Sequence, residues 1–283
     1  MSLISPEDLA RRLDDPDLRI VDVRWYLGKP GAGRLAYDAG HLPGAIYVDL
    51  DQDLVARSGP GRHPLPEPGT FAARLGELGI GSRSFVVAYD DVGGWVAARL
   101  WWMLDNLGHR AVTVLDGGLP AWTSLGQPLT TEVVVPPPPA DLRLADHWSR
   151  TVDREGLLGE LRAQGRPVIL DARAGPRYRG EVEPIDPAAG HIPTALSAPT
   201  DGNLGADGRF LAPAELGERF RGLGAESGNV VTSCGSGVSA CHNALAMRVA
   251  GLPDPILYPG SWSDWSTAGF PGAVGPEPGL PPD

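Results

Sequence analysis

The chain has 283 residues, of which 42% are hydrophobic and 21% charged, a composition typical of a globular protein that excludes a disordered one. A net charge of −11 and a pI near 5.0 argue against nucleic acid or an anionic membrane surface as a partner. Two cysteines cannot form a disulfide framework, so we expect a cytoplasmic protein. The N-terminal sequence lacks the pattern of a signal peptide, and no apolar segment is long enough to span a membrane.

Short apolar strands alternate with helical segments along the chain. In the first half we expect strands at 19–23, 85–89 and 112–116 and helices at 6–13, 70–78 and 95–104. In the second half we expect strands at 167–171 and 229–233, with helices at 154–163, at 213–223 and from about Ser239 onward. This alternation predicts an α/β fold in which each half forms a mostly parallel sheet flanked by helices.

The two halves repeat the same features. LRIVDVRW (Leu18–Trp25) and RPVILDARAG (Arg166–Gly175) are both strands that end in Asp-x-Arg, and each is followed by a Gly-His-x-Pro turn. We therefore predict two tandem domains at residues 1–130 and 150–283. The linker at 131–149 contains four consecutive prolines, Pro136–Pro139, which favour a stiff extended connector.

Cys234 lies between the strand at 229–233 and the next helix, and is followed by Gly235, Ser236 and Gly237. Ligands of parallel sheets bind beyond the carboxyl ends of the strands, and a helix N-terminus favours a thiolate. In the gapless alignment of the halves, Asp90 occupies the position of Cys234. A carboxylate is a poor replacement for a space-filling thiol, so we interpret the second loop as chemically active and the first as inactive. The alternative is a buried, inert thiol.

The tandem halves, both Gly-His-x-Pro turns and the segment CGSGVSAC resemble the two-domain rhodanese-type sulfurtransferases over nearly the whole chain. The Cys-Gly-Ser-Gly-Val loop is similar to that of the 3-mercaptopyruvate branch, with Ser239 where threonine is usual. The resemblance implies two rhodanese-like domains and a persulfide formed on Cys234. It implies a small anionic donor, 3-mercaptopyruvate or thiosulfate, and cyanide, a thiol or a thioredoxin-like protein as acceptor. We expect a monomer with no cofactor.

The resemblance also implies a catalytic set around the cysteine. Ser236 matches a serine that works with a histidine and an aspartate of the first domain, for which His63 and Asp51 are the matching residues, in a cleft between the domains. A surface-loop histidine and a turn or helix-cap carboxylate stay open as alternatives for these two. The loop from Gly235 through Gly237, Val238 and Ser239 would direct its N–H groups toward the sulfur.

Donor binding requires a cation. Arg177 matches the substrate arginine of the family, and Arg179 is a second candidate nearby. Mercaptopyruvate enzymes usually carry another arginine after the Glu-Pro of this segment, where this chain has Ile185 and Asp186. The sequence of the cysteine loop favours 3-mercaptopyruvate as the donor, whereas the absence of this second arginine argues against it. The choice between the two donors therefore stays open.

Other conspicuous residues fit structural roles. His41 and His191 occupy equivalent turns in both halves, and the same holds for Asp22 and Arg24 and for Asp171 and Arg173, which we expect to form buried turn or ion-pair contacts. Cys241 is expected to be a packed helical thiol. No residue cluster has metal-ligand spacing, so no metal is predicted.

Three other functions compete with sulfur transfer. A cysteine phosphatase requires an arginine six residues after the nucleophile, where this chain has Ala240. A non-catalytic protein-binding module would not need the intact cysteine loop. A thiol–disulfide switch between Cys234 and Cys241 would require both thiols.

Overall fold

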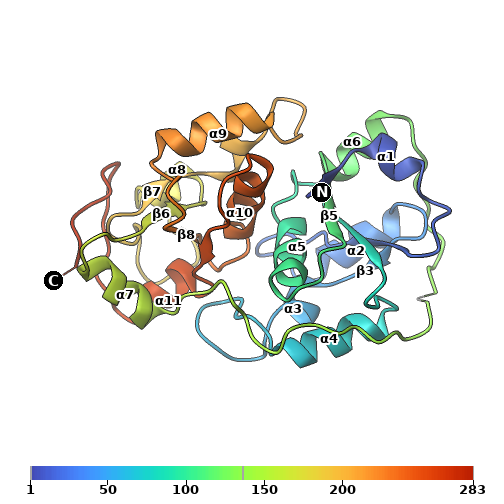
Figure 1. The fold of residues 1–283 in the computed structure, drawn as a ribbon, viewed down its shortest axis with the longest axis horizontal. Coiled ribbons are helices and arrows are strands. Elements are labelled where there is room, and N and C mark those ends of the chain that lie inside the picture. Colours follow the sequence, from blue (N-terminus) through green and yellow to red (C-terminus); the bar gives the residue numbers. More distant parts are fainter. Residues whose placement is uncertain (1, 136, 283) are drawn as a thin grey trace. The chain divides into compact units, whose positions relative to one another are not determined.

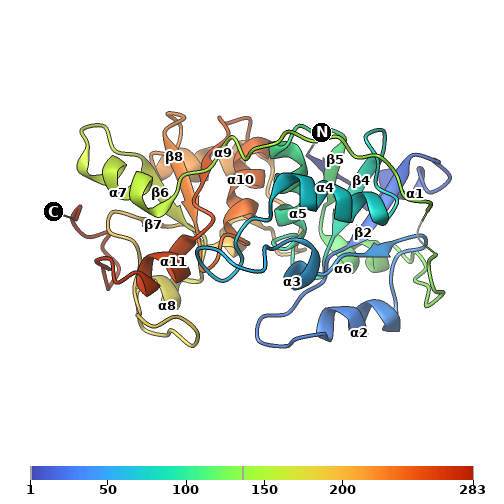
Figure 2. The same ribbon diagram turned by 90° about the horizontal axis from the view of Figure 1, so that it is seen from below.

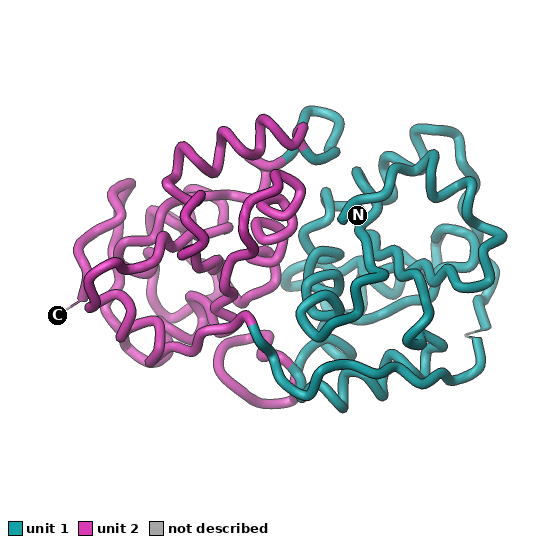
Figure 3. Tube along the Cα trace, in the orientation of Figure 1, with its two compact units in different colours: residues 1–55, 66–149, 204–210 teal, residues 56–65, 150–203, 211–283 magenta. Residues whose placement is uncertain are grey.

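The computed structural model describes residues 2–135 and 137–282, which form two compact units (Figure 3). Unit 1 comprises residues 1–55, 66–149 and 204–210, and unit 2 comprises residues 56–65, 150–203 and 211–283. The sequence predicted continuous domains, whereas two short segments belong to the unit of the other half of the chain. Pro136, the first of the four linker prolines, lies outside the described residues.

Unit 1 contains a five-stranded sheet in the order β1-β5-β4-β2-β3, in which every pair is parallel. The helices follow the strands in the chain and flank the sheet (Figures 1 and 2). The strands are β1 (Leu3–Ile4), β2 (Leu18–Asp22), β3 (Ile46–Tyr47), β4 (Phe85–Tyr89) and β5 (Val112–Leu115), and the helices are α1 (Pro6–Ala10), α2 (Ala32–Ala39), α3 (Leu50–Asp53), α4 (Pro68–Glu77), α5 (Ala97–Asn106) and α6 (Gly118–Ser124).

Unit 2 repeats this plan with a four-stranded parallel sheet in the order β7-β6-β8-β9. Its strands are β6 (Val168–Asp171), β7 (Leu196–Ser197), β8 (Val230–Ser233) and β9 (Ile256–Leu257), and its helices are α7 (Arg154–Arg162), α8 (Gly175–Tyr178), the 3-10 helix η1 (Thr200–Asn203), α9 (Pro213–Gly222), α10 (Ala240–Val249) and α11 (Ser261–Thr267). The α/β prediction is therefore confirmed for both halves.

The predicted elements form where the apolar pattern agrees with the residues that begin and end a helix. The side chain of Ser5 accepts a hydrogen bond from the Asp8 N–H and so caps α1, and Pro6 occupies its first turn. Each sheet packs on an apolar core, with Trp122 in that of unit 1 and Trp262 and Trp265 in that of unit 2. Burial of each large apolar side chain contributes about 1.5–3 kcal/mol, so these cores hold the strand ends in place.

The Gly-His-x-Pro turns are structural in both units, as predicted. Nδ1 of His41 donates to the Tyr37 carbonyl at 2.8 Å, and His191 does the same to Tyr178 at 2.8 Å. In each unit the imidazole stacks on that tyrosine ring with centroids 3.8 Å apart. The two turns therefore have the same local structure in both units.

The Asp-x-Arg ends of β2 and β6 are buried ion pairs. Nη2 of Arg24 lies 2.7 Å from Oδ2 of Asp22, and Nη2 of Arg173 lies 2.6 Å from Oδ2 of Asp171. Burial opposes the charge on Arg24 and Arg173, but the paired aspartates outweigh it and raise the pKa of both arginines. The predicted structural role of these residues is confirmed.

Within the described ranges, no helix combines the length and the apolar character that crossing a bilayer would require.

Candidate active site

Cys234 follows the last residue of β8 and lies in a loop that leads into α10. Its Sγ accepts hydrogen bonds from the N–H of Gly237 at 3.1 Å and of Ser236 at 3.5 Å, and the residue is only 1% exposed. The loop can curl around the sulfur because Gly237 adopts a φ of 76°. A side chain at position 237 would also collide with the carbonyl of Pro259. The thiol therefore lies in a cradle of backbone N–H groups.

The start of α11 fixes the cysteine loop from the other side. The N–H of Cys234 donates to Oγ of Ser261 at 3.1 Å, and the carbonyls of Cys234 and Gly235 accept from Trp262 at 3.0 Å and Ser263 at 2.9 Å. Ser261 is fully buried and has a φ of 52°, a left-handed conformation that is costly for a serine. In this conformation its hydroxyl accepts the N–H of Cys234 and donates to the carbonyl of Tyr258 at 2.9 Å.

The equivalent loop of unit 1 surrounds a carboxylate with backbone N–H groups. The carboxylate of Asp90, at the position of Cys234, accepts four backbone hydrogen bonds of 2.8–2.9 Å from Val92, Gly94, Val96 and Ala97. Burial raises the pKa of Asp90, and these four N–H donors oppose the rise. Its carboxylate oxygens stand one bond further from the backbone than a cysteine sulfur does. A second sulfur attached to a cysteine would stand the same number of bonds from the backbone as these oxygens do.

Ser236 and His63 come together in unit 2. Nδ1 of His63 lies 2.7 Å from Oγ of Ser236, and both residues are 7% exposed. Although His63 belongs to the first half of the sequence, its segment, residues 56–65, packs into unit 2. The surface-loop alternative for His63 is wrong, because the imidazole is buried and hydrogen-bonded.

Asp51, the third residue of the predicted set, lies in unit 1 on the short helix α3. Its carboxylate accepts a hydrogen bond from Nε1 of Trp25 at 2.7 Å. A catalytic role for Asp51 with His63 stays a prediction, as does the position of the site between the domains.

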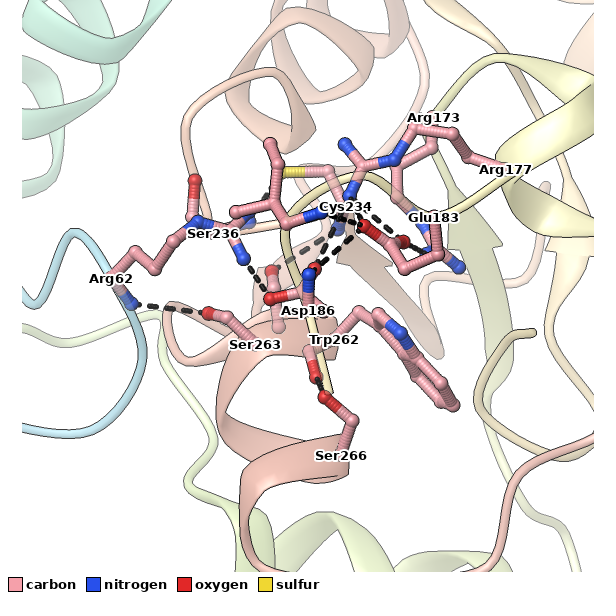
Figure 4. A network of polar contacts seen from close by, with 12 residues as sticks. Arg62, Arg173, Arg177, Glu183, Asp186, Cys234, Ser236, Trp262, Ser263 and Ser266 are labelled. Carbon is pink, nitrogen blue, oxygen red and sulfur yellow. Dashed lines mark hydrogen bonds and ion pairs between the residues drawn. The ribbon is translucent and has the colours of Figure 1, made fainter. Parts of the chain in front are cut away.

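Arg177 projects from α8 into a network of charged groups beside Cys234 (Figure 4). Its Nη2 contacts both carboxylate oxygens of Glu183, at 2.8 and 2.9 Å, and Oδ2 of Asp186 at 3.2 Å. The same Glu183 carboxylate accepts the N–H groups of Ile185 and Asp186 at 3.1 Å each. Glu183 thus orders the turn and orients the arginine at once.

Arg62 is a site residue that the sequence analysis missed. Its guanidinium forms an ion pair with Asp186, and its backbone N–H donates to Oγ of Ser263 at 3.1 Å. Burial and the neighbouring positive charge of Arg177 lower the pKa of Arg62. The available signal was Asp186 itself, an acid in a segment where an arginine was expected. Its partner, however, lies more than a hundred residues away in the sequence.

The remaining predicted residues occupy different environments. Gly235 borders the two guanidinium groups, and Val238 and Ser239 continue the loop into α10. Arg179 lies instead in an exposed pair with Glu181, at 2.6 and 2.8 Å. In the part of the chain that the structure describes, the contacts of Arg179 do not reach the cysteine loop.

Cys241 is fully buried in α10, as expected of a packed helical thiol, and its Sγ donates to the carbonyl of Gly237 at 3.4 Å. Neither Cys234 nor Cys241 forms a disulfide. Among the described residues, no group of three or more histidine, cysteine or acidic side chains is placed to hold a metal ion.

Comparisons with known proteins agree with this geometry. The family described as Rhodanese-like domain matches residues 5–125 and 156–268, which is both halves of the chain. The chain belongs to the two-domain rhodanese-type sulfurtransferases. It is 48% identical over 272 residues to a Pseudomonas aeruginosa protein named "Probable 3-mercaptopyruvate sulfurtransferase", covering 94% of this chain and 95% of that one. It is 37% identical to human 3-mercaptopyruvate sulfurtransferase, covering 93% of this chain and 91% of the human protein.

Solved sulfurtransferase structures share the fold. The 3-mercaptopyruvate sulfotransferase SseA from Escherichia coli superimposes with a TM-score of 0.81 at 32% identity, covering 93% of this chain and all of that one. The 3-mercaptopyruvate sulfurtransferase from Leishmania major gives a TM-score of 0.83 at 30% identity, covering 94% of this chain and 74% of that chain. Among the relatives of this sulfurtransferase are also thiosulfate enzymes, such as rat thiosulfate sulfurtransferase at 36% identity over 93% of this chain and 91% of that one.

Proposed function

We propose that this sulfurtransferase moves a sulfane sulfur from a small anionic donor to a thiophilic acceptor through a persulfide on Cys234. The observation that carries the proposal is the pair of equivalent loops. The loop in unit 2 surrounds a thiol with N–H groups, and its counterpart in unit 1 holds a carboxylate with four. A loop that binds an anion at the position of the outer sulfur is suited to stabilise Cys-S-S⁻.

In the first half-reaction the Cys234 thiolate attacks the outer sulfur of the donor. A new S–S bond forms on the enzyme while the bond between that sulfur and the rest of the donor breaks. With thiosulfate the electron pair leaves on sulfite, and with 3-mercaptopyruvate it leaves on the enolate of pyruvate, which then takes up a proton. Because the transfer is divided in two, neither step requires donor and acceptor to be bound together.

Ser236 and His63 are suited to the mercaptopyruvate branch of this chemistry. The 2.7 Å contact links a hydroxyl to an imidazole, which can supply a proton through the hydroxyl or let the hydroxyl polarise the substrate carbonyl. Thiosulfate needs no proton at this step, because sulfite leaves as an anion. We therefore expect Ser236→Ala and His63→Asn to slow transfer from 3-mercaptopyruvate much more than transfer from thiosulfate.

In the second half-reaction the acceptor attacks the outer sulfur and restores the Cys234 thiolate. Cyanide would yield thiocyanate, and a thiol or a thioredoxin-like protein would yield a persulfide of its own. Two cysteines that form no disulfide fit a reducing compartment, and we propose a cytoplasmic monomer.

The test is thiocyanate formation from cyanide, with 3-mercaptopyruvate and thiosulfate as separate donors. Wild type should be active and Cys234→Ser inactive with both donors, while Cys241→Ser should keep most of the activity. A disulfide switch instead requires that Cys241→Ser abolish function. Full activity of Cys234→Ser would refute the persulfide route, and an inactive wild type would favour a binding module.

A further inference from the structure

Unit 1 contains a pocket of about 990 Å³ whose lining includes neither the cysteine loop nor the loop of Asp90. Residues of α2, of α3, of the C-terminal half of α4 and of β3 line it, together with residues 131–134 of the linker (Figure 2). A volume of this size is at the upper end of what ligand sites in proteins enclose. The pocket can therefore hold part of an extended polypeptide chain.

In unit 2 the chain itself covers the corresponding Gly-His-x-Pro turn. The carbonyl of Glu277 lies 3.2 Å from Nε2 of His191, and the carbonyl of Pro278 accepts the N–H of Thr194 at 2.6 Å. The counterpart of His191 in unit 1 is His41, which lines the pocket. Its buried Nε2 has no hydrogen-bond partner among the described residues. An extended segment of the chain thus contacts this histidine in one unit and not in the other.

The linker of unit 1 leaves the turn and binds elsewhere. It pairs with His41 at Thr130 and continues to the end of α4, where the N–H of Ala140 donates to the carbonyl of Gly76 at 2.9 Å. The pocket is also lined by both residues of β3, which is the edge strand of the five-stranded sheet. Edge strands offer backbone groups to which an extended chain can bind. The pocket is therefore suited to a segment supplied by another molecule.

The charges of the pocket favour a basic occupant. Two arginines line it, and each pairs with an acid of the same pocket. Arg34 lies 2.9 Å from Asp38, and Arg74 lies 2.7 Å from Asp53. Three further acids line the pocket, so that acids outnumber arginines by five to two among its described residues: Asp49, Asp51 and Glu132. A partner with positive charges complements this surface.

Apolar side chains add to the same surface. Leu35 on α2 is 71% exposed and Val133 in the linker is 86% exposed, and both line the pocket. Ile46 of β3 lies among them and is buried. Exposed apolar side chains that border one pocket are typical of an interaction site. The occupant should therefore carry apolar side chains as well as basic ones.

We propose that this pocket binds an extended segment of a partner protein, one that carries basic and apolar side chains, beside β3. The segment would cover the turn of His41 as residues 275–280 cover that of His191. The C-terminal segment of this chain is itself a poor occupant of the pocket, because Glu277 would meet like charges there. The proposal concerns a surface of unit 1 that sulfur transfer does not use, so binding is measured without the reaction.

The probes are two fluorescein-labelled, C-terminally amidated peptides. One has the sequence of residues 274–281, VGPEPGLP, and the other differs from it only by Glu277→Lys. Their affinity for the full chain is measured by fluorescence anisotropy at low salt, where attraction between exposed charges is strongest. A second preparation of each peptide carries a benzophenone side chain at the position of Leu280. Cross-linking followed by peptide mass spectrometry then locates the bound peptide.

The pocket variant is Asp49→Asn/Glu132→Gln, which removes two negative charges. Asparagine at position 49 can still cap α3, as the Asp49 side chain does, so the helix should be retained. The matched control is Glu218→Gln/Glu226→Gln, which removes two negative charges from exposed positions in unit 2. Urea unfolding of both variants verifies that neither substitution destabilises the protein.

We expect the lysine peptide to bind wild type about tenfold more tightly than the glutamate peptide, and its Kd to rise about fivefold in the pocket variant. The control should keep the wild-type Kd, and the cross-links should map to α2 or to residues 131–134. The proposal is overturned if the lysine peptide does not bind, or if the control weakens its binding as much as the pocket variant does. Cross-links confined to unit 2 would also overturn it, because the peptide would then have replaced the chain's own C-terminal segment.

Discussion

Replacing Asp90 by asparagine tests whether the loop between β4 and α5 stabilises an anion. The carboxylate accepts two N–H groups on each oxygen, Val92 and Gly94 on Oδ1 and Val96 and Ala97 on Oδ2. The side-chain amide of an asparagine has one oxygen, so two of the four donors would face an NH₂ group and lose their acceptor. The substitution changes neither the size of the side chain nor the backbone.

The expected cost follows from the number of hydrogen bonds lost. Each hydrogen bond to a charged group contributes about 1.5–3 kcal/mol, and burying a neutral amide in place of a charge returns part of the loss. We therefore expect Asp90→Asn to lower the free energy of unfolding by roughly 3 kcal/mol. Asp38→Asn, which removes an exposed ion pair with Arg34, should change it by less than about 0.5 kcal/mol.

The assay is urea unfolding followed by tryptophan fluorescence, together with hydrogen exchange of the peptides from β4 and α5. Asp90→Asn should raise exchange most strongly in those peptides. A loss below about 1 kcal/mol, or one no larger than that of Asp38→Asn, would refute the reasoning. The four N–H groups would then not stabilise an anion, and the N–H groups around Cys234 would not be expected to stabilise a persulfide anion.

Three further predictions concern the cysteine loop and a buried histidine. Ser261→Ala should destabilise the protein by about 1–3 kcal/mol and slow alkylation of Cys234, and Ser261→Gly should recover about 1 kcal/mol of that stability, because glycine accepts a φ of 52°. Gly235→Ala should change stability little but raise the KM for anionic donors, measured by thiocyanate formation, since its methyl group would displace flexible guanidinium ends. Burial lowers the pKa of His109, so the unfolded state takes up a proton first as the pH falls through about 6.5. Its contribution to stability is present above that pH and declines below it, so His109→Gln should weaken the fall in unfolding free energy between about pH 7.5 and 5.5, as measured by urea titration.

Much of the fold was predictable because each of these strands is a short apolar run that can be recognised from the local sequence alone. The apolar run Phe85–Tyr89 forms β4 as predicted, and the other predicted strands that the structure contains differ by a residue at most at either end. The duplicated turns were assigned correctly because the same residues recur in a half that has no cysteine. That comparison separates structural from chemical roles within one sequence.

The surroundings of Cys234 were less predictable because they depend on long-range contacts. Arg62 and His63 reach the cysteine loop only because residues 56–65 pack into unit 2, and no periodicity of the sequence encodes that placement. From the sequence, Ile185 and Asp186 stand where a second arginine was expected, so a positive charge seemed to be missing. In the structure Asp186 pairs with both Arg62 and Arg177. Arg179 is close to Arg177 in sequence but is held by Glu181 on the surface, since neighbouring residues of a short helix point in different directions.

The persulfide itself gives the most direct test of the account. Wild type and Cys234→Ser are treated with thiosulfate, freed of donor, and measured by intact-protein and peptide mass spectrometry before and after cyanide is added. The account predicts one added sulfur atom on Cys234 in wild type, removed by cyanide with one equivalent of thiocyanate, and none in Cys234→Ser. Sulfur loaded on Cys241 instead, or thiocyanate formed by wild type without any sulfur bound to Cys234, would contradict it.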